Sequence, residues 1–125
     1  MLNEGLVRAE CEALIQLMAD FGADCVVDAW NPFACLAARA ARQPLVTIIQ
    51  ADMHPGNPGF IWWRLPPPNL PTPAPVVSRV LARYRLPPIS RVAELFVGDL
   101  TLMVGMPATD PVPATAPVTY IGPAW

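Results

Sequence analysis

The chain has 125 residues with a formal net charge of -2, and 54% of its residues are hydrophobic while only 14% are charged. This length suits one domain, and the low charged content predicts that much of the surface is buried, internally or against another molecule. The eight arginines are scattered along a chain without lysine, which excludes the clustered basic surface of a nucleic-acid-binding protein.

The first residues, MLNEGLVRAECE, include acidic side chains and lack the basic start and cleavage site of a signal peptide. Arg, Asp, Pro or Gly interrupts every apolar run before it reaches the roughly 18 residues that a membrane span needs. We therefore expect a cytoplasmic protein without a transmembrane segment. The three cysteines, Cys11, Cys25 and Cys35, lack a C-x-x-C spacing, and their apolar surroundings predict buried, reduced thiols.

Residues 3 to about 21 are predicted to form an amphipathic helix, because apolar side chains recur at steps of three and four. Asn3 is the expected N-cap, and Gly22 is a usual signal for the end of a helix. A short apolar strand is then expected at residues 25–27, ending at Asp28.

A second helix is predicted at residues 32–41, with Asn31 as its N-cap and Pro32 as its first residue. The following run LVTII, residues 45–49, is typical of a parallel strand that is covered on both faces. Strand, helix and strand within about thirty residues indicate a βαβ unit with a right-handed crossover. The fold class is therefore α/β.

Residues 51–74 form a long connection that is rich in Pro and Gly but also contains Phe60, Trp62 and Trp63. Loops longer than about 12 to 15 residues in compact domains tend to be functional or disordered. The three aromatic residues favour either a wall of an apolar ligand pocket or a plug that fills the cleft or packs on the following helix.

The remaining elements complete a small sheet. A helix is expected at about residues 75–84, a short helical piece within 86–95, and two strands at 98–105 and 118–122. With the earlier unit, these elements predict a partial Rossmann-like parallel sheet of about four strands, flanked by helices.

Other polar residues are assigned structural roles. His54, the only histidine, could be a replacement base or a metal ligand with Asp52. One histidine and one carboxylate do not make a site, so an exposed loop histidine is expected. Asp99 and Asp110 are expected to cap turns or strand ends. No G-x-G-x-x-G or P-loop is present, so neither a metal nor a nucleotide is expected to bind to this chain.

Three segments, DAWNPFACLAARAARQPLVTI, GDLTLMVGMPATDPVP and VTYIGP, resemble in order and spacing the N-terminal domain of GT-B glycosyltransferases. The resemblance covers residues 6–123 and is closest to the bacterial enzymes that act on macrolides and other antibiotics. It implies a domain that binds a small lipophilic acceptor, such as a macrolide, flavonoid or sterol. In this family an N-terminal histidine deprotonates the acceptor hydroxyl and an aspartate orients that histidine; Asp28 matches the aspartate.

The chain departs from the family pattern at both ends. The early strand with its Gly-His signature and the C-terminal donor domain are absent, and residues 123–125 match the start of the interdomain linker. The resemblance thus implies a fragment of an acceptor-binding domain, inactive alone, whose nucleotide-sugar donor would bind to the missing domain. Asp28 is then the orienting partner of a histidine that this chain does not encode, and Trp30 and Asn31 are expected to contact the acceptor. The plainer interpretation is that Asp28 caps the turn at Asn31.

Two further expectations concern partners. Instead of an enzyme fragment, the chain could be a non-catalytic auxiliary module of a glycosyltransferase system that holds a ligand or a partner through residues 51–74. In the sheet order of this family, the strand that ends at Asp28 neighbours the missing first strand, so the resemblance implies an exposed edge, where unpaired N–H and C=O groups attract another strand. This predicts either a further chain or domain that completes the sheet, or self-association through the edge.

Overall fold

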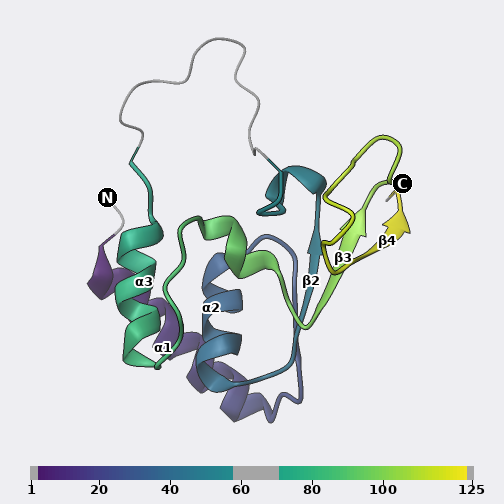
Figure 1. Cartoon of the computed structure of the whole chain (residues 1–125). Coiled ribbons are helices and arrows are strands. Elements are labelled where there is room, and N and C mark those ends of the chain that lie inside the picture. Colours follow the sequence, from purple (N-terminus) through teal and green to yellow (C-terminus); the bar gives the residue numbers. More distant parts are fainter. Residues whose placement is uncertain (1–2, 58–70, 124–125) are drawn as a thin grey trace.

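The computed structural model describes residues 3–57 and 71–123, which fold into one sheet and a layer of helices (Figure 1). In chain order, the elements are α1 (Glu4–Phe21), β1 (Val26–Asp28), α2 (Pro32–Ala41), β2 (Leu45–Ile49), the 3-10 helix η1 (Ala51–Met53), α3 (Ala74–Arg83), the 3-10 helix η2 (Val92–Phe96), β3 (Leu100–Val104) and β4 (Val118–Gly122). The predicted α/β class is confirmed.

The ends of α1 form as the local sequence predicts. The Asn3 side chain accepts a hydrogen bond from the Leu6 backbone N–H (2.9 Å), which satisfies one of the free donors of the first turn. Gly22 adopts a left-handed conformation (φ 61°), and its N–H bonds to the Ala19 carbonyl, which ends the helix.

The four strands lie side by side in the order β1-β2-β3-β4, and every neighbouring pair is parallel. Within the described residues, β1 pairs only with β2, in a register that sets Asp28 opposite Thr47. Because the strands are parallel, their carboxyl ends meet along one edge of the sheet. Asp28 lies at that edge, on the outermost strand.

All three α-helices lie on the same side of the sheet (Figure 1). Alternate residues of β2 and β3 face this side and are buried: Leu45, Thr47, Ile49, Thr101 and Met103. Ile49 and Met103 form a second apolar cluster with Ala51 of η1, beside the core of the α-helices. Helices α1, α2 and α3 share one apolar core. The Arg39 guanidinium of α2 holds η2 against this core by donating hydrogen bonds to the backbone carbonyls of Glu94, Leu95 and Val97. Consecutive right-handed crossovers along a sheet in this strand order place their helices on one face.

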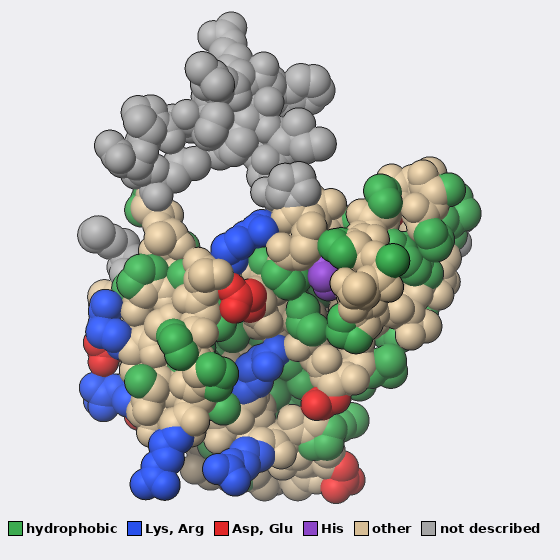
Figure 2. Space-filling view, in the orientation of Figure 1, with side chains coloured by type: hydrophobic (Ala, Val, Ile, Leu, Met, Phe, Trp, Pro, Cys, Tyr) green, Lys and Arg blue, Asp and Glu red, His purple; other side chains and the backbone are tan. Residues whose placement is uncertain are grey.

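The opposite face of the sheet is apolar, and no described helix covers it. Val27 is 63% exposed and Ile121 is 49% exposed, while Val46 and Ile48 of β2 are only partly buried. Figure 2 shows hydrophobic side chains over the part that holds β3, β4 and their connection, whereas most arginines in this view lie over the helical part. Among residues 3–57 and 71–123, the expectation that LVTII is covered on both faces is therefore met on one face only.

The predicted burial of the cysteines is correct for Cys11 and Cys35 but wrong for Cys25, which is exposed. Cys25 precedes the first paired residue of the edge strand, so only one neighbouring strand lies near it. None of the described helices combines the length and the hydropathy that crossing a membrane requires.

Replacing Gly98 by alanine should destabilise the sheet. A Cβ atom at this position would collide with the Leu45 carbonyl oxygen, a backbone atom that cannot move without disturbing β2. We expect a loss of about 1–3 kcal/mol in the free energy of unfolding, measured by urea denaturation. Gly5→Ala is the control, because its Cβ would meet only the Asn3 side chain and alanine favours the helix. Equal stability of Gly98→Ala and the wild type would contradict this prediction.

Candidate functional site

Ligands of open α/β sheets bind beyond the carboxyl ends of the strands, and Asp28 lies at that edge. Its side chain is only 5% exposed. The Asn31 backbone N–H donates to both carboxylate oxygens, at 3.2 Å to Oδ1 and 3.1 Å to Oδ2. The Cys35 thiol donates to Oδ2 at 3.3 Å. The carboxylate is therefore held in one orientation by the turn that joins β1 to α2.

Asn31 has the capping role that the sequence predicts. Its Oδ1 accepts the backbone N–H groups of Phe33 (3.0 Å) and Ala34 (3.3 Å), and Pro32 occupies the first helical position. Two of the donors that a helix start leaves unpaired are thus satisfied. The expected contact between Asn31 and an acceptor stays a prediction.

Trp30, in the same turn, has an unusual backbone conformation. Its φ of 86° lies in the left-handed region, where a bulky residue is an outlier that costs about 1–2 kcal/mol. The side chain is nonetheless 57% exposed. Strained backbone and exposed aromatic rings are both features of binding sites, so the predicted acceptor contact at Trp30 is compatible with its position.

Cys35 is a partner of Asp28 that the sequence did not indicate. Burial raises the pKa of the Cys35 thiol well above its ordinary value, and the charge of Asp28 and their hydrogen bond raise it further. The thiol therefore stays protonated and acts as a donor. Only its place on the first turns of α2, facing the sheet, could have suggested this contact.

His54 is buried, which corrects the expectation of a solvent-exposed loop histidine. The side chain is 5% exposed, and its Nδ1 accepts the Gly56 backbone N–H at 3.0 Å. This bond places the proton on Nε2, which finds no hydrogen-bond partner among the described residues. The connection between β3 and β4 reaches this loop, since Pro113 lies against Gly56. Local Pro and Gly signals predict a loop but cannot reveal a covering segment that follows some sixty positions later in the chain.

Asp28 and His54 follow neighbouring strands, but no hydrogen bond or ion pair joins them in the described part of the chain. The loop of His54 is held elsewhere: the Arg91 guanidinium donates to the carbonyls of Pro55 (2.9 Å) and Asn57 (3.0 Å). His54 is therefore not the base that Asp28 orients in this structure.

Stability should fall when the pH drops below about 6.5, the ordinary pKa of histidine. Burial lowers the pKa of His54, so the unfolded chain binds a proton more readily than the folded one. The stabilisation is complete above the unfolded-state pKa and is lost as the pH falls through the folded-state pKa. Urea denaturation at pH 7.5, 6.5 and 5.5 tests this, with His54→Phe as the comparison. Since this chain has one histidine, a variant with the same pH dependence as the wild type would refute the assignment.

Asp99 and Asp110 have the predicted capping roles. Asp99 Oδ2 accepts the Leu45 N–H (2.8 Å) at the start of β2, and Asp110 Oδ2 accepts the Thr109 hydroxyl (2.6 Å) and the Met106 N–H (3.3 Å). Phe60, Trp62 and Trp63 lie outside the described residues, so their predicted contact with an acceptor stays a prediction. Within residues 3–57 and 71–123, no three His, Cys, Asp or Glu side chains come together as a metal site.

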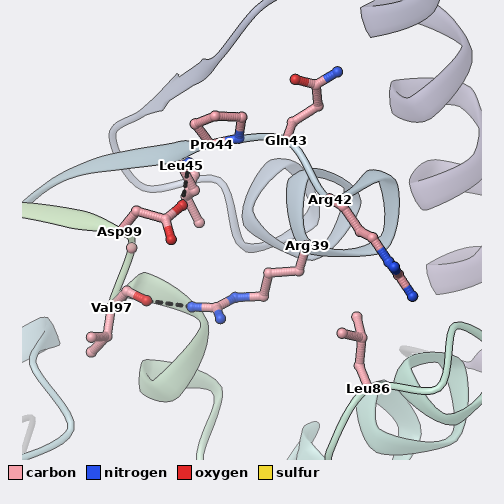
Figure 3. A pocket seen from close by; sticks show the side chains of 9 residues that line it. Arg39, Arg42, Gln43, Pro44, Leu45, Leu86, Val97 and Asp99 are labelled. Carbon is pink, nitrogen blue, oxygen red and sulfur yellow. Dashed lines mark hydrogen bonds between the residues drawn. The ribbon is translucent and has the colours of Figure 1, made fainter.

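A hollow of about 440 Å³ lies at the amino ends of the strands, at the opposite end of the sheet from Asp28 (Figure 3). Arg39 points across it to the Val97 carbonyl, Asp99 binds the Leu45 N–H, and the Arg42 side chain points away from Arg39. These polar groups hold η2 and the start of β2 in place. Position at the carboxyl ends is the better guide to chemistry in this fold, so we take the Asp28 turn as the candidate site.

Comparisons with known proteins assign no family to the chain: no family model matches it, and no protein of curated function matches it. The fold defines an α/β protein with a Rossmann-like parallel sheet, and the site defines a buried carboxylate at the carboxyl end of an edge strand. The resemblance to glycosyltransferases therefore rests on the sequence segments described above.

Proposed function

We propose that this chain forms the acceptor side of a glycosyltransferase active site. The reaction would move a sugar from a nucleotide-sugar donor to a hydroxyl group of a small lipophilic acceptor. The observation that carries the proposal is the position of Asp28: a buried, firmly oriented carboxylate at the carboxyl end of the outermost strand.

Among the described residues only β2 pairs with β1, and the other edge of β1 is where a partner could bring this carboxylate into catalysis. A strand added beside β1 in the parallel sense would end next to Asp28, and a histidine at that end would lie within reach of the carboxylate. A carboxylate paired with imidazole selects the tautomer of the ring and stabilises the imidazolium that forms when the ring accepts a proton. The histidine and the donor-binding domain would come from a further polypeptide segment, so the chain alone should be inactive.

The proposed sugar transfer needs no reactant besides the acceptor and the nucleotide sugar. The acceptor oxygen forms a bond to the anomeric carbon of the sugar as its proton passes to the histidine. The bond from the anomeric carbon to the phosphate oxygen breaks, and the nucleoside diphosphate leaves with the electron pair. Asp28 touches neither substrate in this scheme, so its role is that of a positioning residue.

A second candidate function, a non-catalytic auxiliary module, is favoured by a different observation. Both carboxylate oxygens of Asp28 already accept the Asn31 N–H, and one also accepts the Cys35 thiol, as in a purely structural cap. The uncovered apolar face of the sheet would then serve to hold a partner transferase. In this case Asp28 has no part in turnover.

Sugar transfer by the native assembly tests the proposed function. The chain is tagged in its own organism, purified under mild conditions with whatever completes it, and incubated with nucleoside diphosphate sugars and a panel of lipophilic alcohols. Release of the nucleoside diphosphate and the mass of the glycosylated alcohol are measured. We expect transfer by the assembly and none by the 125-residue chain alone. An assembly that turns over no nucleotide sugar would refute the proposal.

A further inference from the structure

An apolar cavity of about 220 Å³, partly open to solvent, lies within the helical layer, where the first turns of α2 and α3 meet η2. Leu36 of α2, Val77 of α3 and Leu95 of η2 form its buried walls. Phe33 and Val92 are partly exposed at its margin, and Pro73 on its rim is exposed, so the cavity reaches the surface.

The cavity offers no hydrogen-bond donor, although two helices begin beside it. At the start of α2, Pro32 has no N–H, and the next two N–H groups bond to the Asn31 side chain. At the start of α3, the N–H groups of Val76 and Val77 bond to the Pro73 carbonyl, at 3.0 and 3.1 Å. Helix starts usually attract anions through free N–H groups, and this site lacks them.

Acceptors are equally scarce in the cavity wall. The Leu95 carbonyl of η2 already accepts the Arg39 guanidinium at 3.2 Å. All the lining side chains are apolar. A water molecule needs two to four polar partners to be stable in a buried site, so water is poorly held here. Sugars, phosphates and carboxylates are excluded for the same reason.

We propose that this cavity is a binding site for a small, neutral, planar ring compound of one or two fused rings. An apolar cavity of about 150 Å³ in another protein stays dry and binds benzene, and the cavity here is large enough for a naphthalene-sized molecule. Its walls belong to packed helices and exist before binding, so the protein loses little conformational entropy when a ligand binds. The binding needs no sugar donor and no second chain, and it therefore does not depend on the function proposed above.

Equilibrium dialysis of naphthalene against the full 125-residue chain tests this site, since dialysis counts bound ligand whatever the association state. We expect saturable binding with one molecule per chain. Val77→Phe fills the cavity from α3 and should weaken binding about tenfold or more. Val76→Phe is the matched control, because the neighbouring residue on the same helix does not line the cavity, and its affinity should stay within about twofold of the wild type.

Two further variants keep the test decisive. If Val77→Phe does not fold, Val92→Phe narrows the cavity from its partly exposed margin and should weaken binding in the same way. Ile48→Lys places a charge on the uncovered face of the sheet and should leave binding unchanged. Loss of binding in Ile48→Lys, absence of saturable binding in the wild type, or full binding by the cavity-filling variants would each overturn the proposal.

Discussion

If the chain acts as proposed, replacing Asp28 by asparagine is expected to lower the turnover of the glycosyltransferase assembly by about a thousand- to ten-thousand-fold, the scale seen when a histidine loses its carboxylate partner. Asparagine is isosteric and keeps an Oδ1 that can accept the Asn31 N–H, so the turn should still form. What disappears is the negative charge that would orient the imidazole and stabilise its protonated form. The measurement is kcat and KM of the native assembly with a lipophilic alcohol and a nucleotide sugar, across pH 6 to 9.

Two control variants separate catalysis from folding. Asp28→Ala removes the acceptor of the Asn31 N–H and the Cys35 thiol, so it should also cost about 1–3 kcal/mol of stability. Asp110→Asn changes a capping aspartate in the connection between β3 and β4 and should leave turnover intact. If Asp28→Asn retains wild-type turnover and an unaltered pH profile, the auxiliary function is favoured and the positioning role is excluded.

The sequence predicted those parts of the fold that local chemistry determines. Asn3, Gly22 and the Asn31-Pro32 step mark helix ends because caps act on backbone groups within a few residues, and all of them are used as expected. The β-branched run of β2 likewise identifies a strand of a parallel sheet. Boundaries shifted by only one or two residues, as at α3, which begins at Ala74 and not at residue 75.

Features that depend on distant segments could not be predicted. His54 is buried because the connection near Pro113 packs on its loop, and Cys25 is exposed because its strand lies at the edge of the sheet. The uncovered face of the sheet also depends on distant segments. The side chains of β2 are apolar on both faces, but the order of the strands places every described helix on one face. Sequence periodicity indicates which residues are buried, but it does not indicate which segment of the chain covers them.

The candidate site, like the fold, could be predicted from the sequence only where local residues determine it. Asp28 could be placed at the carboxyl end of a strand, because the strand signal ends there. Its thiol donor Cys35 depends on how α2 packs back on the sheet, and the apolar cavity depends on three elements separated by long connections. The role of Asp28 depends on the segment beside β1: with a histidine supplied there it is half of a catalytic pair, and without one it is a cap.

The uncovered sheet should make the isolated chain self-associate. Parallel sheets are normally covered on both faces, and an edge strand with free N–H and C=O groups is a template for another strand. Here Val27 on the edge strand and Ile121 on the opposite edge are both exposed on the uncovered face. We expect concentration-dependent association in sedimentation velocity, and strong binding of a dye that reports exposed apolar surface.

Lysine substitutions test which surface is responsible for this association. Val27→Lys and Ile121→Lys together place charges on the face and at both edges, and should weaken association about tenfold or more, because each lysine would have to be desolvated in the contact. Leu6→Lys is the matched control: Leu6 is similarly exposed (44%) but lies on α1, away from the sheet. Association that weakens equally in Leu6→Lys would locate the contact elsewhere. A wild-type chain that is monomeric, unfolds cooperatively and binds no dye would show that a four-stranded sheet with one covered face is stable by itself. The physical argument for a completing segment would then fail.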